Sequence, residues 1–285
     1  MPDLRPDRIH EVQAPRELPL QQRLSPWVLM WNHTGLRKTV VLVCLAALWE
    51  IYARGLDNTL LFPTLSETMK ALWNGLLDGT VVLATWSSVQ VLLKGYVSGM
   101  LCAGLLTAIA SATRLGSDVL ETLTAMFNPL PSIALLPLAM IWFGLGEGSI
   151  IFVLIHAVLW AVALNTHAGF RSVSTTWRMV GQNYGLSPLG YVLHILIPGA
   201  FPSILTGLKI GWAFAWRTLI AAELVFGASS GQGGLGWYIF QHKNMLDVPN
   251  VFAGLLTVIL FGLLVENLIF KTIEKRTVVR WGMQN

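Results

Sequence analysis

Three charged residues lie in a segment of the sequence, 198–226, that is otherwise apolar enough to cross a membrane. A charge inside a span usually faces a protein interior or a water-filled path, because its burial in lipid is costly. Lys209 and Arg217 are about 80° apart on a helical wheel and share a broad face, whereas Glu223 points elsewhere. Because a guanidinium binds oxyanions bidentately, Arg217 is the best candidate for an anion contact. A structural ion pair of Arg217 with Glu223 or Glu266 is the alternative, and Lys209 can also reach the membrane surface.

Other patterns of reactive residues do not indicate catalysis. The chain contains no G-x-x-x-x-G-K-[ST], so it has no P-loop with which to hydrolyse ATP. The stretch GQGGLG (231–236) matches G-x-G-x-x-G but follows a membrane helix instead of a strand, which favours a flexible turn. His, Cys, Asp and Glu show no metal-ligand spacing. We interpret His156 as a hydrogen-bonded packing residue, and Cys44 and Cys102 as small core residues. We therefore expect no enzyme activity, no metal and no cofactor bound by this chain.

Composition predicts an all-α integral membrane protein. The 285 residues are 54% hydrophobic and 12% charged, about half the charged fraction of soluble domains. A helix that crosses the bilayer needs roughly 20 apolar residues. The sequence contains six such segments, at about 39–53, 81–112, 119–143, 149–168, 198–226 and 250–270.

Proline and small residues predict how some of these spans are built. Pro129, Pro131 and Pro137 fall in the third span, where each removes a backbone hydrogen bond, so we expect a kinked, pore-lining helix. Small residues recur every four positions in two other spans and predict close helix packing. These residues are Gly95, Gly99 and Ala103 in the second span, and Gly207, Gly211 and Ala215 in the fifth.

The charges outside the spans predict the orientation of the chain. Thirteen Lys and Arg fall on one side of the membrane, against Lys70 and Lys243 on the other, which places both termini in the cytoplasm of a bacterial inner-membrane protein. We expect a mostly disordered tail (1–38), a transmembrane domain (39–275) with a cytoplasmic loop at about 171–198, and a short C-terminal tail (276–285). Thr64-x-x-Glu67 forms a capping box that predicts an outer interfacial helix.

The cytoplasmic loop predicts a helix–turn–helix elbow. A short helix can begin near Ser174 and end at Gly185, and Ser187-Pro188 then supplies an N-cap and a first-turn proline for a second helix. That helix continues into the fifth span, with Pro198 at the junction. Trp177, Met179, Val180 and Tyr184 place apolar groups on a surface that faces water, which suggests docking to another protein.

This stretch resembles the EAA loop of ABC-importer permeases, whose pattern is E-A-A-x3-G-x9-I-x-L-P. The chain has Met179-Val180-Gly181, three residues, Gly185, nine residues, and then Ile195-Leu196-Ile197-Pro198. The spacing matches throughout. Met179 replaces the family glutamate, Val180 and Gly181 replace the two alanines, and Ile197 replaces leucine, so a salt bridge from the glutamate to the ATPase is in doubt.

The resemblance covers about 39–275, and the stretches LLPLAMIWFGLGEGSIIFVL and GLKIGWAFAWRTLIAAELVFGASSGQGGLGWYI look like the sulfonate, taurine and nitrate permease subfamily. It implies a type I permease fold in a homodimer, two cytoplasmic ATPase subunits that hold ATP and magnesium, and a periplasmic binding protein that delivers a small anion. No nucleic acid is implied. The alternatives are an ion-driven secondary transporter, for which no inverted repeat is visible, and a membrane enzyme, whose acidic residues would have to be less dispersed.

The resemblance and the residue patterns together give two sets of candidate site residues. The ATPase-coupling positions are Trp177, Met179, Val180, Gly181, Tyr184, Gly185, Ile195, Ile197 and Pro198. The candidate substrate path contains Arg217, Lys209, Glu223, Pro131 and Pro137.

Overall fold

The computed structural model describes residues 32–111, 113–226 and 233–283, and all the regular structure in these ranges is helical. The chain divides into two compact units, 1–51 and 52–285. Helix α2 (Thr34–Leu56), most of which belongs to the first unit, is long and apolar enough to cross a membrane. Most of the expected N-terminal tail and the first two residues of the GQGGLG stretch (231–236) lie outside the described residues, whereas Leu235 and Gly236 form the start of a helix.

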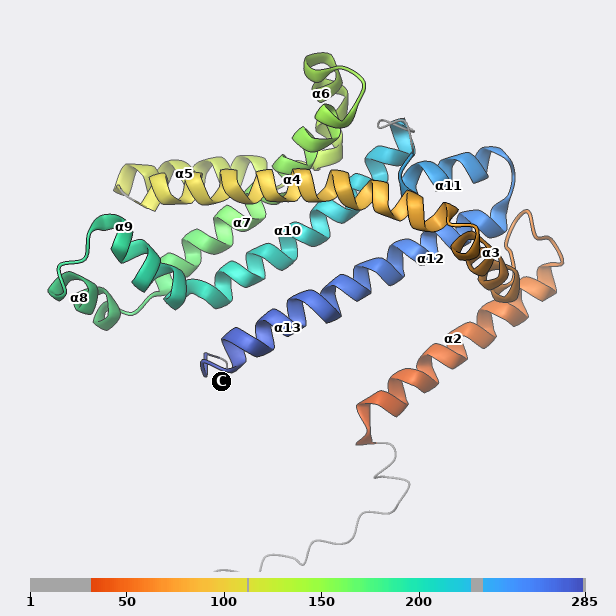
Figure 1. Cartoon of the computed structure of the whole chain (residues 1–285), viewed down its shortest axis with the longest axis horizontal. Coiled ribbons are helices and arrows are strands. Elements are labelled where there is room, and N and C mark those ends of the chain that lie inside the picture. Colours follow the sequence, from red (N-terminus) through yellow and green to blue (C-terminus); the bar gives the residue numbers. More distant parts are fainter. Residues whose placement is uncertain (1–31, 112, 227–232, 284–285) are drawn as a thin grey trace, which may run out of the picture. The chain divides into compact units, whose positions relative to one another are not determined.

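The second unit contains helices of very different lengths (Figure 1). In chain order they are α3 (Leu65–Leu77), α4 (Thr80–Ser111), α5 (Arg114–Phe127), the 3₁₀ turn η1 (Ser132–Leu135), α6 (Leu136–Phe143), α7 (Glu147–Ser172), α8 (Thr175–Asn183), α9 (Pro188–Tyr191), the π-helical turn η2 (Val192–Leu196), α10 (Ile197–Phe226), α11 (Leu235–Asn244), α12 (Val248–Leu264), the π-helical turn η3 (Val265–Phe270), α13 (Lys271–Glu274) and the π-helical turn η4 (Lys275–Val279).

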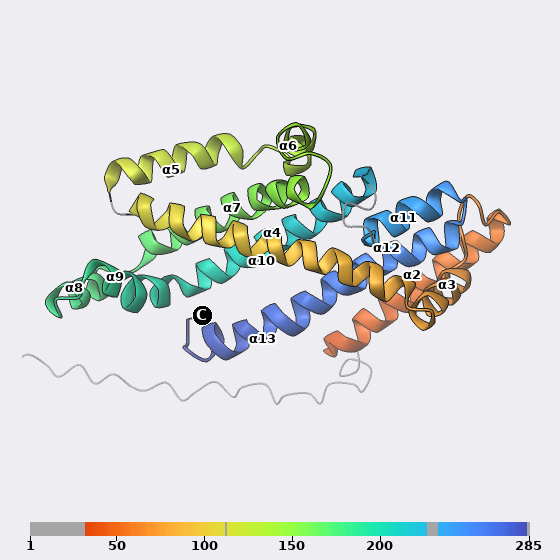
Figure 2. The same cartoon turned by 45° about the horizontal axis from the view of Figure 1, so that its top comes forward.

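Helix α7 is the centre of the second unit and packs against both α4 and α10 (Figures 1 and 2). Glycine makes both contacts possible. A Cβ added to Gly99 of α4 would lie 2.7 Å from the Val158 Cβ, and one added to Gly207 of α10 would lie 2.8 Å from the Asn165 Cβ. These distances are too short for any side chain, so the small-residue stripes predicted from the sequence serve packing within the chain.

The third predicted span is not one continuous helix, which corrects the sequence-based expectation. Helix α5 ends at Phe127, the chain turns through η1, and α6 follows at 87° to α5. Pro129 and Pro131 lie in the break, where neither can donate a backbone hydrogen bond. Pro137 lies in the first turn of α6, where a proline is tolerated, so it does not kink that helix.

The last helical stretch runs beyond the predicted sixth span and reaches Val279 through η3, α13 and η4. Val278 is 2% exposed and belongs to a small core with Leu205 of α10, Val265 and Phe270. Lys209 of α10 donates to Glu274 at 2.6 Å. The end of the chain is therefore attached to the first half of α10 by both apolar and ionic contacts.

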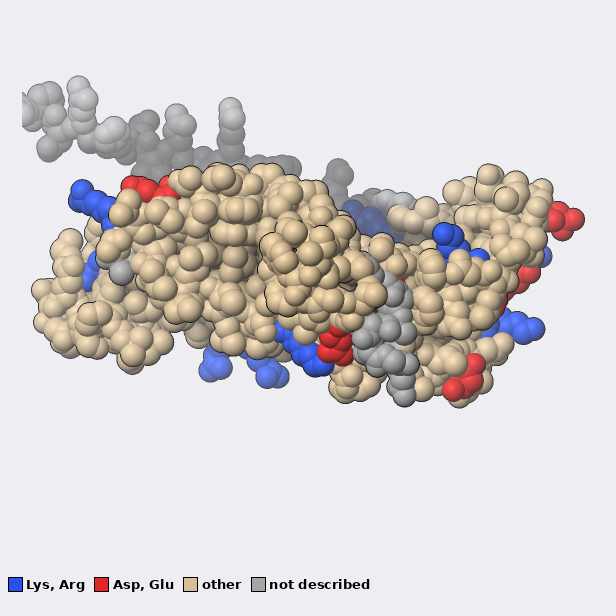
Figure 3. Space-filling model, turned by 90° about the horizontal axis from the view of Figure 1, so that it is seen from above, with Lys and Arg blue, Asp and Glu red and all other residues tan. Residues whose placement is uncertain are grey.

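Three observations concern how the chain could lie in a membrane. The Thr64 hydroxyl accepts from the Glu67 amide and the Glu67 carboxylate accepts from the Thr64 amide, which confirms the predicted capping box at the start of α3. Figure 3 shows the face above α5 and α6, where most of the surface carries no charged side chain and the acidic and basic groups lie near its edges. Five helices among the described residues are long and apolar enough to span, or six if α5 and α6 form one broken span.

Candidate functional site

The elbow predicted between the fourth and fifth spans is present, and its first half is a closed local structure. The Ser174 hydroxyl accepts from the Trp177 amide and caps the start of α8. At the other end the Gly185 amide donates to the Gln182 carbonyl and the Leu186 amide donates to the Gly181 carbonyl. This is a Schellman motif, and it requires the left-handed backbone that Gly185 adopts at φ +62°.

The second half of the elbow leads directly into the fifth span. Ser187 caps α9 by accepting from the Gly190 amide, and Pro188 occupies the first helical position, as the sequence predicted. Helix α9 then passes without a break through the π-helical turn η2 into α10, and Pro198 lies in the first turn of α10. Any displacement of α9 therefore acts on α10 through continuous helical backbone.

Close packing holds the two halves of the elbow together. A Cβ on Gly181 would come within 2.7 Å of the Tyr191 ring and 3.1 Å of Ile195, so only glycine allows this approach of α8 to η2. Ile195 and Ile197 pack against a small core formed by Phe170, Val173, Leu196 and Ala200. Of the predicted coupling residues, Gly181, Ile195 and Ile197 thus face the inside of the elbow.

The outer side of the elbow is apolar and exposed. Trp177 is 61% exposed, Met179 56% and Tyr184 81%, and Leu189 of α9 is also largely exposed. Val180 is half-buried. These side chains lie at the end of α7 and α10 that is opposite to α3 and α11 (Figures 1 and 2). A cluster of exposed aromatic and aliphatic groups of this kind is typical of a surface that binds another protein.

Arg178 connects the elbow to the central helix. Its Nη2 donates to the Phe170 carbonyl at 2.6 Å and its Nε donates to the Val173 carbonyl at 3.1 Å. Both carbonyls belong to the C-terminal end of α7, where backbone acceptors have no helical partner. The forked guanidinium therefore joins α8 to α7, a role that the sequence analysis did not assign to Arg178.

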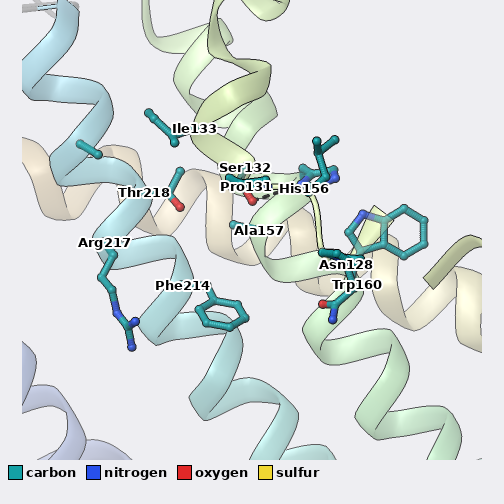
Figure 4. A pocket seen from close by; sticks show the side chains of 13 residues that line it. Asn128, Pro131, Ser132, Ile133, His156, Ala157, Trp160, Phe214, Arg217 and Thr218 are labelled. Atoms are coloured by element: carbon teal, nitrogen blue, oxygen red, sulfur yellow. Dashed lines mark hydrogen bonds between the residues drawn. The ribbon is translucent and has the colours of Figure 1, made fainter. Parts of the chain in front are cut away.

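One pocket brings together two of the five predicted path residues. Arg217 and Pro131 line a pocket of about 370 Å³ between α7, α10 and the turn that follows α5 (Figure 4). Arg217 forms no ion pair with an acidic residue in the described part of the chain, so the alternative of a pair with Glu223 or Glu266 is not observed. Its guanidinium lies 5.8 Å from the centre of the Phe214 ring.

The other three predicted path residues do not line this pocket. Lys209 pairs with Glu274 and lines a second cavity, which it shares with Arg217, in agreement with their common helix face. Pro137 belongs to the first turn of α6. Glu223 is 3% exposed and lines neither of these two cavities.

Glu223 fixes the start of α11. Its carboxylate accepts from the Ser88 hydroxyl at 2.7 and 2.8 Å and from the Gly236 amide at 2.8 Å, and Ser88 in turn accepts from the Leu235 amide. A carboxylate at the first amides of a helix is stabilised by the helix dipole. A Cβ at Gly234 would overlap this carboxylate, so glycine is needed there. Glu223 thereby ties α4, α10 and α11 together.

The sequence analysis did not assign several polar residues of the pocket to a site. Asn128, Ser132, His156, Trp160 and Thr218 all line it. They come from three segments that are distant in the sequence, so no spacing rule links them. The one available signal was the proline-rich turn at 128–132, which the sequence placed in a span. Among the described residues no group of three His, Cys, Asp or Glu is placed to hold a metal.

Comparison with known proteins agrees with this architecture. The chain is 26% identical to the putative aliphatic sulfonates transport permease protein of Escherichia coli, over 91% of this chain and 92% of that protein. It is 29% identical to the taurine transport system permease protein of the same organism, over 79% and 82%. It is 26% identical to the nitrate import permease protein of a Synechocystis strain, over 87% and 92%.

The match to a family as a whole covers more than half of the chain. Residues 100–278 match the family described as the binding-protein-dependent transport system inner membrane component. This range includes α5–α12, the elbow and the pocket, and its all-helical architecture is the type I permease fold. The chain is therefore a member of this family of ABC-importer permeases, a multi-pass membrane protein.

Proposed function

We propose that this chain is the translocation subunit of an ATP-driven importer that carries a small oxyanion of the sulfonate, taurine or nitrate kind into the cytoplasm. Three relatives, each matched over most of its length, are named for aliphatic sulfonates, taurine and nitrate. An unpaired Arg217 on the pocket wall fits such a cargo, because a guanidinium suits oxyanions. The chain itself performs no covalent chemistry, and ATP and magnesium belong to a separate ATPase subunit.

The main observation that supports this proposal is the structure of the elbow. Its outer side exposes Trp177, Met179 and Tyr184, and its inner side is closed by Gly181 against Tyr191. We infer that the outer side docks on a cytoplasmic ABC ATPase. The complete importer would contain two copies of this chain, two ATPase subunits and a binding protein on the outer side of the inner membrane, with both termini of the permease in the cytoplasm.

The same geometry supports a route for coupling. Arg178 attaches α8 to the end of α7, while α9 continues into α10. A movement of the docked ATPase would therefore reach both helices whose side chains line the Arg217 pocket. Such a movement shifts the equilibrium between two arrangements of the bundle, provided that the ATPase binds one of them more tightly.

Capture of a candidate ABC ATPase by the detergent-solubilised chain tests the proposal. Gly185→Pro would disrupt the elbow, since proline cannot adopt φ +62°. Gly79→Pro is a matched control, because Gly79 also has a positive φ, +80°. Gly79 lies in the turn between α3 and α4, at the end of the unit that is opposite to the elbow (Figure 1). We expect the wild type and Gly79→Pro to retain the ATPase and Gly185→Pro to lose it.

The opposite result would favour the secondary transporter. If neither form binds an ATPase, and vesicles that contain the chain alone take up an anion in response to an ion gradient without ATP, the importer proposal is wrong. Membrane insertion of each variant is checked first by its recovery in the membrane fraction, so that a failure to insert is not mistaken for a loss of docking.

A further inference from the structure

We propose that the pocket between α7, α10 and the turn after α5 is a cargo subsite that prefers an oxyanion with an apolar skeleton, such as an alkanesulfonate, over a bare inorganic oxyanion such as nitrate. The inference rests on the proposed function and names the class of cargo that the path selects. It assigns direct contacts to Trp160, His156 and Arg217, of which only Arg217 was suggested by the sequence.

Unpaired hydrogen-bond donors are the first observation. The Trp160 side chain is buried, at 8% exposure, and its Nε1 has no partner among the described residues. An indole N–H can only donate, so the group that satisfies it must be an acceptor. The Nε2 of His156 is also buried without a partner, while its Nδ1 lies 3.1 Å from the Ser132 hydroxyl. A neutral imidazole that accepts from Ser132 presents its proton on Nε2.

The arrangement of these groups is the second observation. Figure 4 shows Trp160, His156 and Asn128 on one side of the pocket, contributed by α7 and the turn after α5, and Phe214, Arg217 and Thr218 on the other side, contributed by α10. Trp160 is held in place by stacking on Phe127 with ring centroids 5.4 Å apart. The donors are thus fixed before a ligand arrives, which reduces the entropy lost on binding.

The charge of the wall favours an anion. Arg217 is the charged residue among those that line the pocket, and none of the lining residues is acidic. Its guanidinium is exposed at one edge of the pocket, beyond the Phe214 ring (Figure 4). Within this pocket an anion meets no carboxylate that would repel it, and Glu266 lines the adjacent cavity on the other side of Arg217. The same arrangement would leave the donors unsatisfied around a cation.

Size and apolar surface argue against a bare inorganic ion. The pocket measures about 370 Å³, within the range of small-molecule sites, whereas a water molecule takes up about 30 Å³ of liquid. A nitrate ion has four heavy atoms and would fill a small part of this space. Ile133, Ala157 and Phe214 supply apolar wall between the two sets of polar groups. A short carbon chain attached to the oxyanion would cover these side chains and remove apolar surface from water.

Direct binding to the purified permease–ATPase complex, without the binding protein, tests the proposal because the selectivity of the binding protein then has no influence. The probes are butanesulfonate and nitrate, measured by calorimetry. We expect butanesulfonate to bind at least tenfold more tightly than nitrate. Trp160→Phe keeps an aromatic ring but removes the N–H, and should weaken butanesulfonate binding about tenfold. Arg217→Gln should weaken it further, and Arg217→Lys should restore part of the loss.

Trp142→Phe is the matched control, since Trp142 lies on α6, packs edge-on against Phe152 and does not line the pocket. It should bind butanesulfonate as the wild type does. Equal affinity for the two anions, or an unchanged affinity in Trp160→Phe, would overturn the proposal. If the wild type binds neither anion but still transports sulfonate with ATP, this inference fails and the proposed function stands. If the complex transports no anion with ATP, the proposed function fails as well.

Discussion

In the bundle around α7, helix backbones approach so closely that a single methyl group does not fit at Gly95, Gly99 or Gly207. At the elbow, by contrast, aromatic and aliphatic side chains extend outward from α8, and Tyr184 is 81% exposed. Where α4 and α10 meet α7, the bundle buries apolar side chains such as Val153, Leu154 and Leu219, whereas the elbow exposes Trp177, Met179 and Tyr184. This difference predicts that substitutions in the bundle change stability, whereas substitutions on the proposed docking surface of the elbow change partner binding.

The largest effect on stability is expected from the bundle. In Gly99→Ala the new Cβ would lie 2.7 Å from the Val158 Cβ and 3.2 Å from the Ile155 carbonyl oxygen. Overpacking of this kind typically costs about 1–3 kcal/mol. We expect a lower midpoint of thermal unfolding for the detergent-purified protein. Gly104→Ala on the same helix is the control, because its Cβ would meet no atom within 4 Å, and it should leave the midpoint unchanged or raise it. Equal midpoints for the two variants would show that the bundle is not tightly packed at Gly99.

The elbow should respond in the opposite way. Trp177→Ala together with Tyr184→Ala removes two exposed aromatic side chains, so the midpoint of unfolding should stay close to that of the wild type. Aromatic anchors often account for most of the binding energy of an interface, and we expect ATPase affinity to fall at least tenfold in surface-immobilised binding measurements. Trp73→Ala on α3 is the control, since Trp73 is 62% exposed at the other end of the unit. A marked loss of stability with unchanged ATPase affinity would make the elbow part of the scaffold.

Arg178 lies where the two regions meet, and its replacement should separate docking from transport. Arg178→Lys keeps the charge but loses the fork that reaches the carbonyls of Phe170 and Val173 together. We expect the ATPase to bind, while the number of anions transported per ATP hydrolysed falls severalfold in reconstituted vesicles. Arg171→Lys is the control, because Arg171 is exposed and pairs with Glu121, and exposed pairs contribute little. An unchanged number of anions transported per ATP in Arg178→Lys would show that this contact does not couple the ATPase to transport.

Much of this fold follows from local sequence. The long apolar segments predicted the spans. The two short helices of the elbow were predicted from Ser174, Gly185, Ser187 and Pro188, because caps and turns depend on residues within a few positions. The break between α5 and α6 was only half predicted. The prolines indicated a kink. The size of the bend, 87°, depends on the helices against which these two segments pack.

The pocket was much harder to predict, because its chemistry depends on contacts between distant segments. The charge of Glu223 suggested a path residue, but no local pattern indicated that its carboxylate accepts from the Ser88 hydroxyl and the Gly236 amide. His156 and Trp160 resembled ordinary residues of an apolar span, and their unpaired nitrogens become apparent only when α5, α7 and α10 are placed together. Hydrogen-bond satisfaction is a property of the folded arrangement, so no local pattern in the sequence reports it.

The smallest effect is expected at the turn between α11 and α12. This turn resembles neither the bundle nor the elbow, because three of its half-buried polar side chains pair with one another. The Asp247 carboxylate accepts from Asn250 at 2.7 Å and from His242 at 3.0 Å. Partial burial raises the pKa of Asp247, but the hydrogen bonds from Asn250 and His242 outweigh it and lower the pKa below 3.8. The carboxylate therefore stabilises the turn above about pH 4, and this contribution is lost as the pH falls through the lowered pKa.

Amide hydrogen exchange at 242–250, corrected for intrinsic rates, should show weaker protection near pH 3 than near pH 6. The protection of α7 should change less, and Asp247→Asn should abolish the difference at the turn. An acid response that persists in Asp247→Asn would assign it to another group.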